Sequence, residues 1–121
     1  MAEPDDPLLG SELVELRIRP DSVGFVFVSG GYWVLEICVD FYLRKGGRTI
    51  ATIDPIELDD LSVLRKLIGT SVSQVNWPEM PPAVPISIVL SDQTVIEIPN
   101  LRSHQFSRGT LVGPNSIWEE F

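Results

Sequence analysis

The chain has 121 residues, 44% of them hydrophobic, and a formal net charge of −8 from seventeen acidic and nine basic residues. This length predicts one domain over residues 1–121, large enough to bury about two thirds of the surface that the unfolded chain exposes. No apolar run reaches the roughly 18 residues of a membrane span, so we expect no membrane insertion. The negative charge repels nucleic acid and favours basic partners, although it also serves simply to keep a protein dissolved.

The first ten residues carry three carboxylates and two prolines, which predicts a flexible acidic arm over residues 1–10. This start lacks the basic and then apolar stretches of a secretory signal. The chain has a single cysteine, Cys38, which cannot form an internal disulfide. We therefore expect a cytoplasmic protein.

Strand patterns dominate the first half of the chain. Apolar and polar residues alternate over 12–19, which predicts a half-buried strand that ends at Pro20. Residues 23–28 are apolar on both faces, as in a strand covered on both sides. From 33 to 43 every odd position is large and apolar, which predicts one long strand over 32–44 with its odd face toward the core. The members of that odd face are Trp33, Leu35, Ile37, Val39, Phe41 and Leu43.

A hairpin is expected after this strand, because Gly46 and Gly47 supply the positive φ angles of a tight turn. Counting pairs back from that turn places Leu43 opposite Ile50.

Residues Asp54–Ile68 carry the signals of one principal helix. Asp54 suits the N-cap, Pro55 the first helical position and Gly69 the C-terminal stop. Apolar residues recur at three- and four-residue steps, namely Leu58, Leu61, Leu64, Leu67 and Ile68. We expect this helix to cover the odd face of the strand over 32–44.

Three more strands are expected over 72–77, 84–90 and 94–98, the first with a bulge between Ser73 and Gln74. A three-residue loop joins the last two and keeps Ile88 opposite Ile96 and Ile86 opposite Ile98. Such a loop requires a left-handed backbone at Gln93, where glycine is usual.

The C-terminal segment is less regular. Residues 101–107 suit a loop or one helical turn, 110–112 a short strand, and 116–121 a final short strand or tail. The whole chain therefore predicts an α+β fold, a mainly antiparallel sheet of seven to eight strands with one principal helix, Asp54–Ile68, packed on one face.

No catalytic or cofactor motif stands out. His104, the only histidine, has no acid–base partner nearby in the sequence, and we interpret it as a surface or capping residue. Cys38 resembles a small hydrophobe, since Glu36 and Asp40 beside it oppose the lowered pKa of a reactive thiol. The acidic residues after Asp54 are accounted for by helix-start chemistry, so we expect no metal ion and no cofactor.

One predicted surface suits a protein partner. If the odd positions of the long strand face the helix, Tyr32, Glu36, Asp40 and Tyr42 share the opposite face. Aromatic residues beside carboxylates fit a basic protein partner. Two plainer interpretations compete: an ordinary solvated sheet face, or a face partly covered by the C-terminal segment.

Several stretches resemble a bacterial domain of unknown function associated with immunity proteins of polymorphic toxin systems. The matching stretches are residues 53–55, 64–69, 90–93 with the strand that follows, and 111–114. The chain departs from that pattern at Gln93, where a glycine is expected, and at 104–106, where an aromatic motif is not reproduced. The resemblance implies a binding protein without catalytic residues.

Three functions therefore stay open from the sequence. The first is a non-enzymatic acidic binding protein, such as an immunity protein that neutralises a basic toxin. The second is a small-molecule-binding or enzymatic domain with a pocket between helix and sheet. The third is a structural subunit of an assembly that buries its strand edges.

Overall fold

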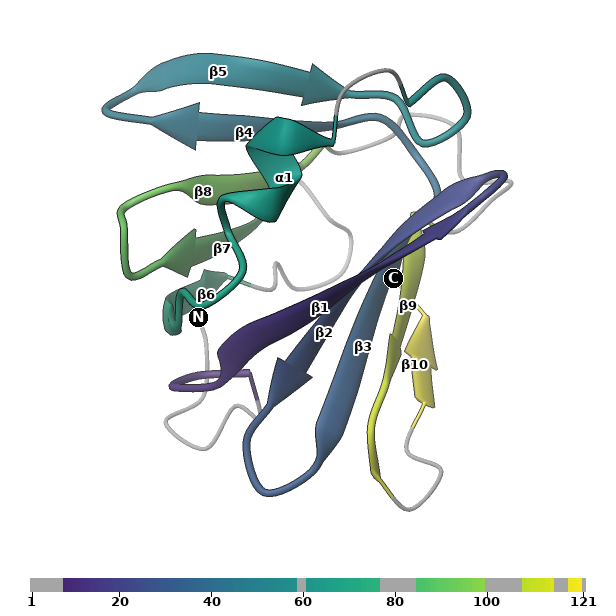
Figure 1. Ribbon diagram of the computed structural model, residues 1–121, viewed down its shortest axis with the longest axis vertical. Helices are drawn as coiled ribbons and strands as arrows, with labels where there is room; N and C mark the ends of the chain where they lie inside the picture. Colours follow the sequence, from purple (N-terminus) through teal and green to yellow (C-terminus); the bar gives the residue numbers. More distant parts are fainter. Residues whose placement is uncertain (1–7, 59–60, 77–84, 100–107, 115–117, 121) are drawn as a thin grey trace.

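The structure is a computed structural model that describes residues 8–58, 61–76, 85–99, 108–114 and 118–120. Within them, ten strands form two antiparallel five-stranded sheets (Figure 1). Sheet 1 has the spatial order β1 (Glu12–Arg19), β2 (Ser22–Val28), β3 (Tyr32–Ile37), β9 (Gly109–Val112) and β10 (Trp118–Glu120). Sheet 2 has the order β5 (Arg48–Ile53), β4 (Phe41–Lys45), β8 (Val95–Ile98), β7 (Ile86–Leu90) and β6 (Val72–Asn76). The predicted antiparallel pairing is confirmed, but the expected sheet of seven to eight strands is wrong, because the described residues form ten strands in two sheets.

The two sheets share one apolar core, to which the inward side chains of both contribute. Phe25 on β2 and Phe41 on β4 meet edge to face across the sheets, with ring centroids 5.8 Å apart and planes at 76°. This geometry is favourable for aromatic pairs because the positive ring edge meets the negative ring face. The strand β2 is buried on both faces, as the sequence predicts.

The sheets are also joined at one corner, where the chain before β1 lies against the chain before β6. Backbone N–H groups of Gly10 and Leu13 donate to the carbonyls of Val72 and Thr70, both at 2.8 Å, and Gly69 donates to Leu13 at 2.7 Å. Leu8 is fully buried beside this corner. The predicted flexible arm therefore does not extend to residue 10, because residues 8–10 are held by burial and hydrogen bonds; residues 1–7 lie outside the described part.

The predicted long strand over 32–44 is wrong in one respect: it is two strands, β3 and β4, in different sheets. The chain leaves sheet 1 at Cys38 and enters sheet 2 at Phe41 (Figure 1). The odd positions stay buried on both sides of this crossover because both sheets face the same core. Alternation at period two shows which side of a strand is buried, but it does not show whether the chain moves to another sheet.

The predicted principal helix, Asp54–Ile68, is also wrong. The described helix α1 spans only Ser62–Arg65, so the fold is mainly β rather than α+β with a principal helix. The Asp54 carboxylate does accept hydrogen bonds from the N–H groups of Ile56 (2.9 Å) and Glu57 (3.4 Å), as a cap would. The chain after this turn is irregular at Glu57 and Leu58, and residues 59–60 lie outside the described part.

The leucine spacing explains why the sequence favoured a longer helix. Leu64 and Leu67 are buried, and Leu58 and Leu61 pack partly against the core, so the apolar stripe is used without a continuous helix. A short helix depends on tertiary packing more than on intrinsic propensity, so a helical spacing of leucines does not by itself determine how far the helix extends. Gly69 does take the left-handed conformation expected of it, with φ +98°.

The hairpin between β4 and β5 turns at Gly46 and Gly47, both with positive φ, as predicted. Its register differs, because a bulge shifts the pairing: Leu43 lies opposite Ala51 instead of Ile50. Ile50 becomes the extra residue of the bulge and is 49% exposed. A bulge leaves one residue outside the ladder, and turn counting alone does not reveal it.

Predictions for the second half of the chain hold closely. The bulge in β6 lies between Val72 and Gln74, and the hairpin after β7 pairs Ile88 with Ile96. Gln93 is the one described non-glycine residue with positive φ, at +72°. The strands β9 and β10 occupy the places expected of the short C-terminal strands, and residues 100–107, with His104, lie outside the described part.

Replacing Gln93 with glycine should stabilise the fold. A side chain in the left-handed region costs the folded state about 1–2 kcal/mol, which glycine avoids. Glycine has more conformational entropy in the unfolded chain, and this offsets part of the gain. We therefore expect the free energy of unfolding to rise by about 0.5–1 kcal/mol. The control is Gln74→Gly on β6, an exposed strand position with ordinary φ, which should lose about 0.5–1 kcal/mol. Urea unfolding of the two variants measures both. Changes of the same sign would contradict the strain assigned to Gln93.

Candidate functional site

Acidic side chains gather where the chain crosses from sheet 1 to sheet 2. The turn between β1 and β2 brings Asp21 next to this point, because Val23 pairs with Ile37 at the end of β3. Glu36 lies one residue before that end, and Asp40 one residue before β4. We call Asp21, Glu36 and Asp40 the acidic crossover.

The backbone at the crossover is held by a hydrogen bond from the Cys38 N–H to the Arg108 carbonyl at 2.9 Å. Arg108 itself is only 8% exposed, and its guanidinium donates to the carbonyl of Pro99 at 3.3 Å. Burial lowers the pKa of Arg108 from its ordinary value. Within the described residues, the C-terminal segment pairs with the edge of β3 through β9 and holds the crossover through the Arg108 carbonyl.

Charges at the acidic crossover are incompletely balanced. Glu36 forms an ion pair with Arg19, with the Nε–Oε2 distance at 3.4 Å. Asp21 and Asp40 are exposed and have no ion pair within the described residues. The pKa of the Cys38 thiol is raised first by partial desolvation, and then by the charges of Glu36 and Asp21. The second and third of these causes arise because Glu36 and Asp21 place negative charge near the thiol.

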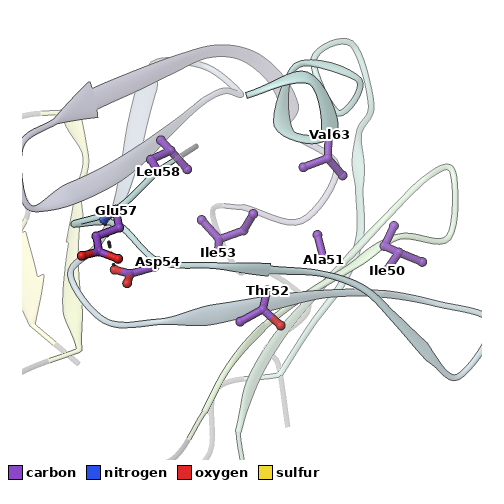
Figure 2. Close-up of a pocket in the computed structure, with 8 residues that line it drawn as sticks. All are labelled: Ile50, Ala51, Thr52, Ile53, Asp54, Glu57, Leu58 and Val63. Atoms are coloured by element: carbon purple, nitrogen blue, oxygen red, sulfur yellow. Dashed lines mark hydrogen bonds between the residues drawn. The ribbon is translucent and has the colours of Figure 1, made fainter. Parts of the chain in front are cut away.

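A shallow cavity lies beside β5, between this edge strand and the chain leading into α1 (Figure 2). Its volume is about 420 Å³. Its lining residues come from β5 and from residues 54–63, namely Ile50, Ala51, Thr52, Ile53, Asp54, Glu57, Leu58 and Val63. We call this cavity the β5 groove.

The β5 groove has an apolar floor and one acidic end. Figure 2 shows Ile50, Ala51 and Ile53 on the side of β5 that faces Val63, with Thr52 on the other side. The carboxylates stand at the end of β5, where Asp54 holds the following turn through its hydrogen bonds. Asp54 also adjoins the acidic crossover, because Phe41 pairs with Ile53 and so Asp40 and Asp54 flank that last rung.

The four residues predicted to form one partner-binding face are divided between the sheets. Tyr32 is 67% exposed on β3, and Glu36 lies on the same strand. Asp40 lies in the crossover, while Tyr42 is half-buried on β4, with the Arg44 guanidinium 5.7 Å from its ring centre. The single face over 32–44 is therefore wrong: of the four residues only Glu36 and Asp40 lie at or next to the crossover, while Tyr32 and Tyr42 lie on strands of different sheets. Their role in binding stays a prediction.

Cys38 is exposed, which corrects its interpretation as a buried hydrophobe. The sequence did not indicate the acidic crossover or the β5 groove. The signal available for the groove was Ile50, a large apolar residue whose exposure follows from the bulge.

The described residues contain no group of three or more His, Cys, Asp or Glu that could hold a metal ion. Their one helix is too short to cross a bilayer.

Comparisons with protein-family models, with curated proteins and with solved structures find no match.

The raised pKa of Cys38 gives a direct test of the crossover potential. Because the thiolate is the reactive form, alkylation by iodoacetamide should need a higher pH than a free cysteine thiol, whose pKa is about 8.5. Glu36→Gln removes a charge that opposes ionisation, so it should shift the pH–rate midpoint down. Glu97→Gln, on the outer face of sheet 2, should leave it unchanged. A wild-type midpoint at or below that of free cysteine would contradict the negative potential.

Proposed function

We propose that this protein is a non-enzymatic acidic binding protein that holds a basic protein partner at the acidic crossover. The observation that carries the proposal is the position of Asp21, Glu36 and Asp40 around the crossover from β3 to β4, where the described residues supply one ion pair, from Arg19 to Glu36, on a chain of net charge −8. Complementary charge speeds and orients association between proteins.

Burial and rigidity support the same surface. Phe41 and Ile37 flank the crossover and are fully buried, so the carboxylates project from a fixed backbone. A rigid site loses little conformational freedom when it binds. The finer proposal, an immunity protein that neutralises a basic toxin, follows from the resemblance of residues 53–55 and 64–69.

A second candidate function rests on the β5 groove. Its volume of about 420 Å³ falls in the range of small-molecule sites, about 300–1,000 Å³, and it lies between helix and sheet. A small-molecule-binding or enzymatic domain would use Asp54 and Glu57 as its polar groups. Among the described residues that line the groove there is no histidine, cysteine or basic residue to assist them, which makes the binding protein the better supported of the two.

The proposal predicts a partner whose capture depends on the acidic crossover. Tagged wild-type protein and the Asp21→Asn/Asp40→Asn variant should be used as baits in lysate of the source cells at low salt. The wild type should retain a basic protein that elutes as salt screens the charges, and the variant should bind that protein at least about tenfold more weakly.

The matched control is Glu12→Gln/Asp92→Asn, which removes the same two charges away from the crossover; an asparagine at 92 keeps an oxygen for the Thr94 N–H. It should bind like the wild type. Equal loss in both variants would reduce the effect to net charge, and failure of the wild type to retain any basic protein would refute the proposed function.

A further inference from the structure

The strand β5 leaves one side of sheet 2 open. In the described part of the chain it pairs only with β4, and its other side is free (Figure 1, top). The opposite edge of the sheet is different, because the chain entering β6 is bonded to the chain entering β1. An open edge offers unpaired backbone N–H and C=O groups to another strand.

We propose that two copies of this chain associate by antiparallel pairing of β5 with β5 of the second copy, about a twofold axis perpendicular to the sheet. The pairing joins the two copies of sheet 2 into one continuous sheet. It uses the same surface on both copies, as a closed twofold interface must. The inference is independent of the basic partner proposed for the acidic crossover.

The order of charges along β5 favours a second copy of this chain as the source of the strand that pairs with it. The strand begins at Arg48, next to Lys45 across the turn, and is followed by Asp54 and Glu57. In an antiparallel register centred on Thr52, Ala51–Ile53 of the two copies pair, and the start of each strand at Arg48 lies toward Asp54 and Glu57 of the other copy. The basic start of each β5 therefore meets the acidic end of the other, at both ends of the interface.

The β5 groove supplies the apolar part of the contact. Its described lining residues come from β5, from 54–58 and from Val63, so it lies over the edge strand. A perpendicular twofold axis places both grooves on the same face of the joined sheet, where they form one trough between the two copies of α1. Ile50, 49% exposed and on the groove side of β5, lies in that trough (Figure 2).

The bulge at Ile50 limits this pairing without preventing it. Bulges and central charges are devices that protect edge strands. In β5 the charges stand at the ends, and Ala51–Ile53 continues as regular strand after the bulge. Backbone pairing is therefore short, and the stability of the dimer depends on the burial of Ile50 and on the charge pairs at the ends.

Sedimentation of the purified full chain over a range of concentrations tests the proposal. The wild type should form a dimer whose dissociation constant rises with salt. Ile50→Lys should weaken the dimer at least about tenfold, because it puts a charge in the apolar trough. The matched control, Gln74→Lys on the far edge of sheet 2, should leave the dimer intact, and circular dichroism checks that each variant is folded.

A mixing experiment tests the charge order. Arg48→Glu and Glu57→Arg should each dimerise poorly alone, since like charges then meet at both ends. Mixed together they should form a heterodimer. Both charges are then reversed at one end of the interface and both are native at the other, so opposite charges meet at both ends.

A wild type that stays monomeric at low salt and high concentration would overturn the proposal. So would a dimer that survives Ile50→Lys, or variants that do not recover on mixing. If hydrogen exchange shows β5 protected only when another protein is added, the edge belongs to a foreign strand and the twofold dimer is wrong.

Discussion

Phe25 and Phe41 come from different sheets and meet edge to face, and this contact stands beside the point where the chain changes sheet. The rest of the structure depends on one constraint. Two sheets must cover one apolar core, and one chain segment must lead from the first sheet to the second. Because an ionised carboxylate is costly to bury without a partner, acidic residues of that passage have to face outward. Asp40 is exposed for this reason, and β1–β2 and β3 bring Asp21 and Glu36 to the same place.

The same core makes the two edges of sheet 2 unequal. At the start of β6 the edge is bonded to the chain entering β1, because the Gly10 N–H donates to the Val72 carbonyl and the Val72 N–H donates to the Ser11 carbonyl. Along the outer side of β5 no described strand is paired, and the described residues 54–58 and 61–63 cover the face of the strand only in part, which leaves the β5 groove. A helix continuing from Asp54 would have covered β5 more fully. Its shortness leaves the β5 groove open, and the bulge exposes Ile50 beside it.

Sequence reasoning succeeded where a local rule was sufficient. A three-residue loop forces one residue into a left-handed backbone, so Gln93 could be assigned from the register of Ile88 and Ile96 alone. It failed where the structure depends on contacts between segments that are far apart in the sequence. The phase of alternation is identical on either side of Cys38, so the change of sheet left no trace in the pattern, and Tyr32 and Tyr42 were placed on one face. The bulge that exposes Ile50 depends on how β4 pairs on both of its sides, which no local signal records.

The two proposed surfaces meet at one rung of sheet 2, because Asp40 belongs to the acidic crossover and Asp54 to the end of β5. Pairing of two β5 strands would neutralise Asp54 with Arg48 of the second copy and leave Asp21, Glu36 and Asp40 exposed. The dimer would then carry two acidic crossovers in a fixed geometry. A basic partner with two matching patches gains effective concentration at the second crossover once it has bound the first. Strand pairing at β5 would in this way strengthen binding at the crossover without adding a single contact there.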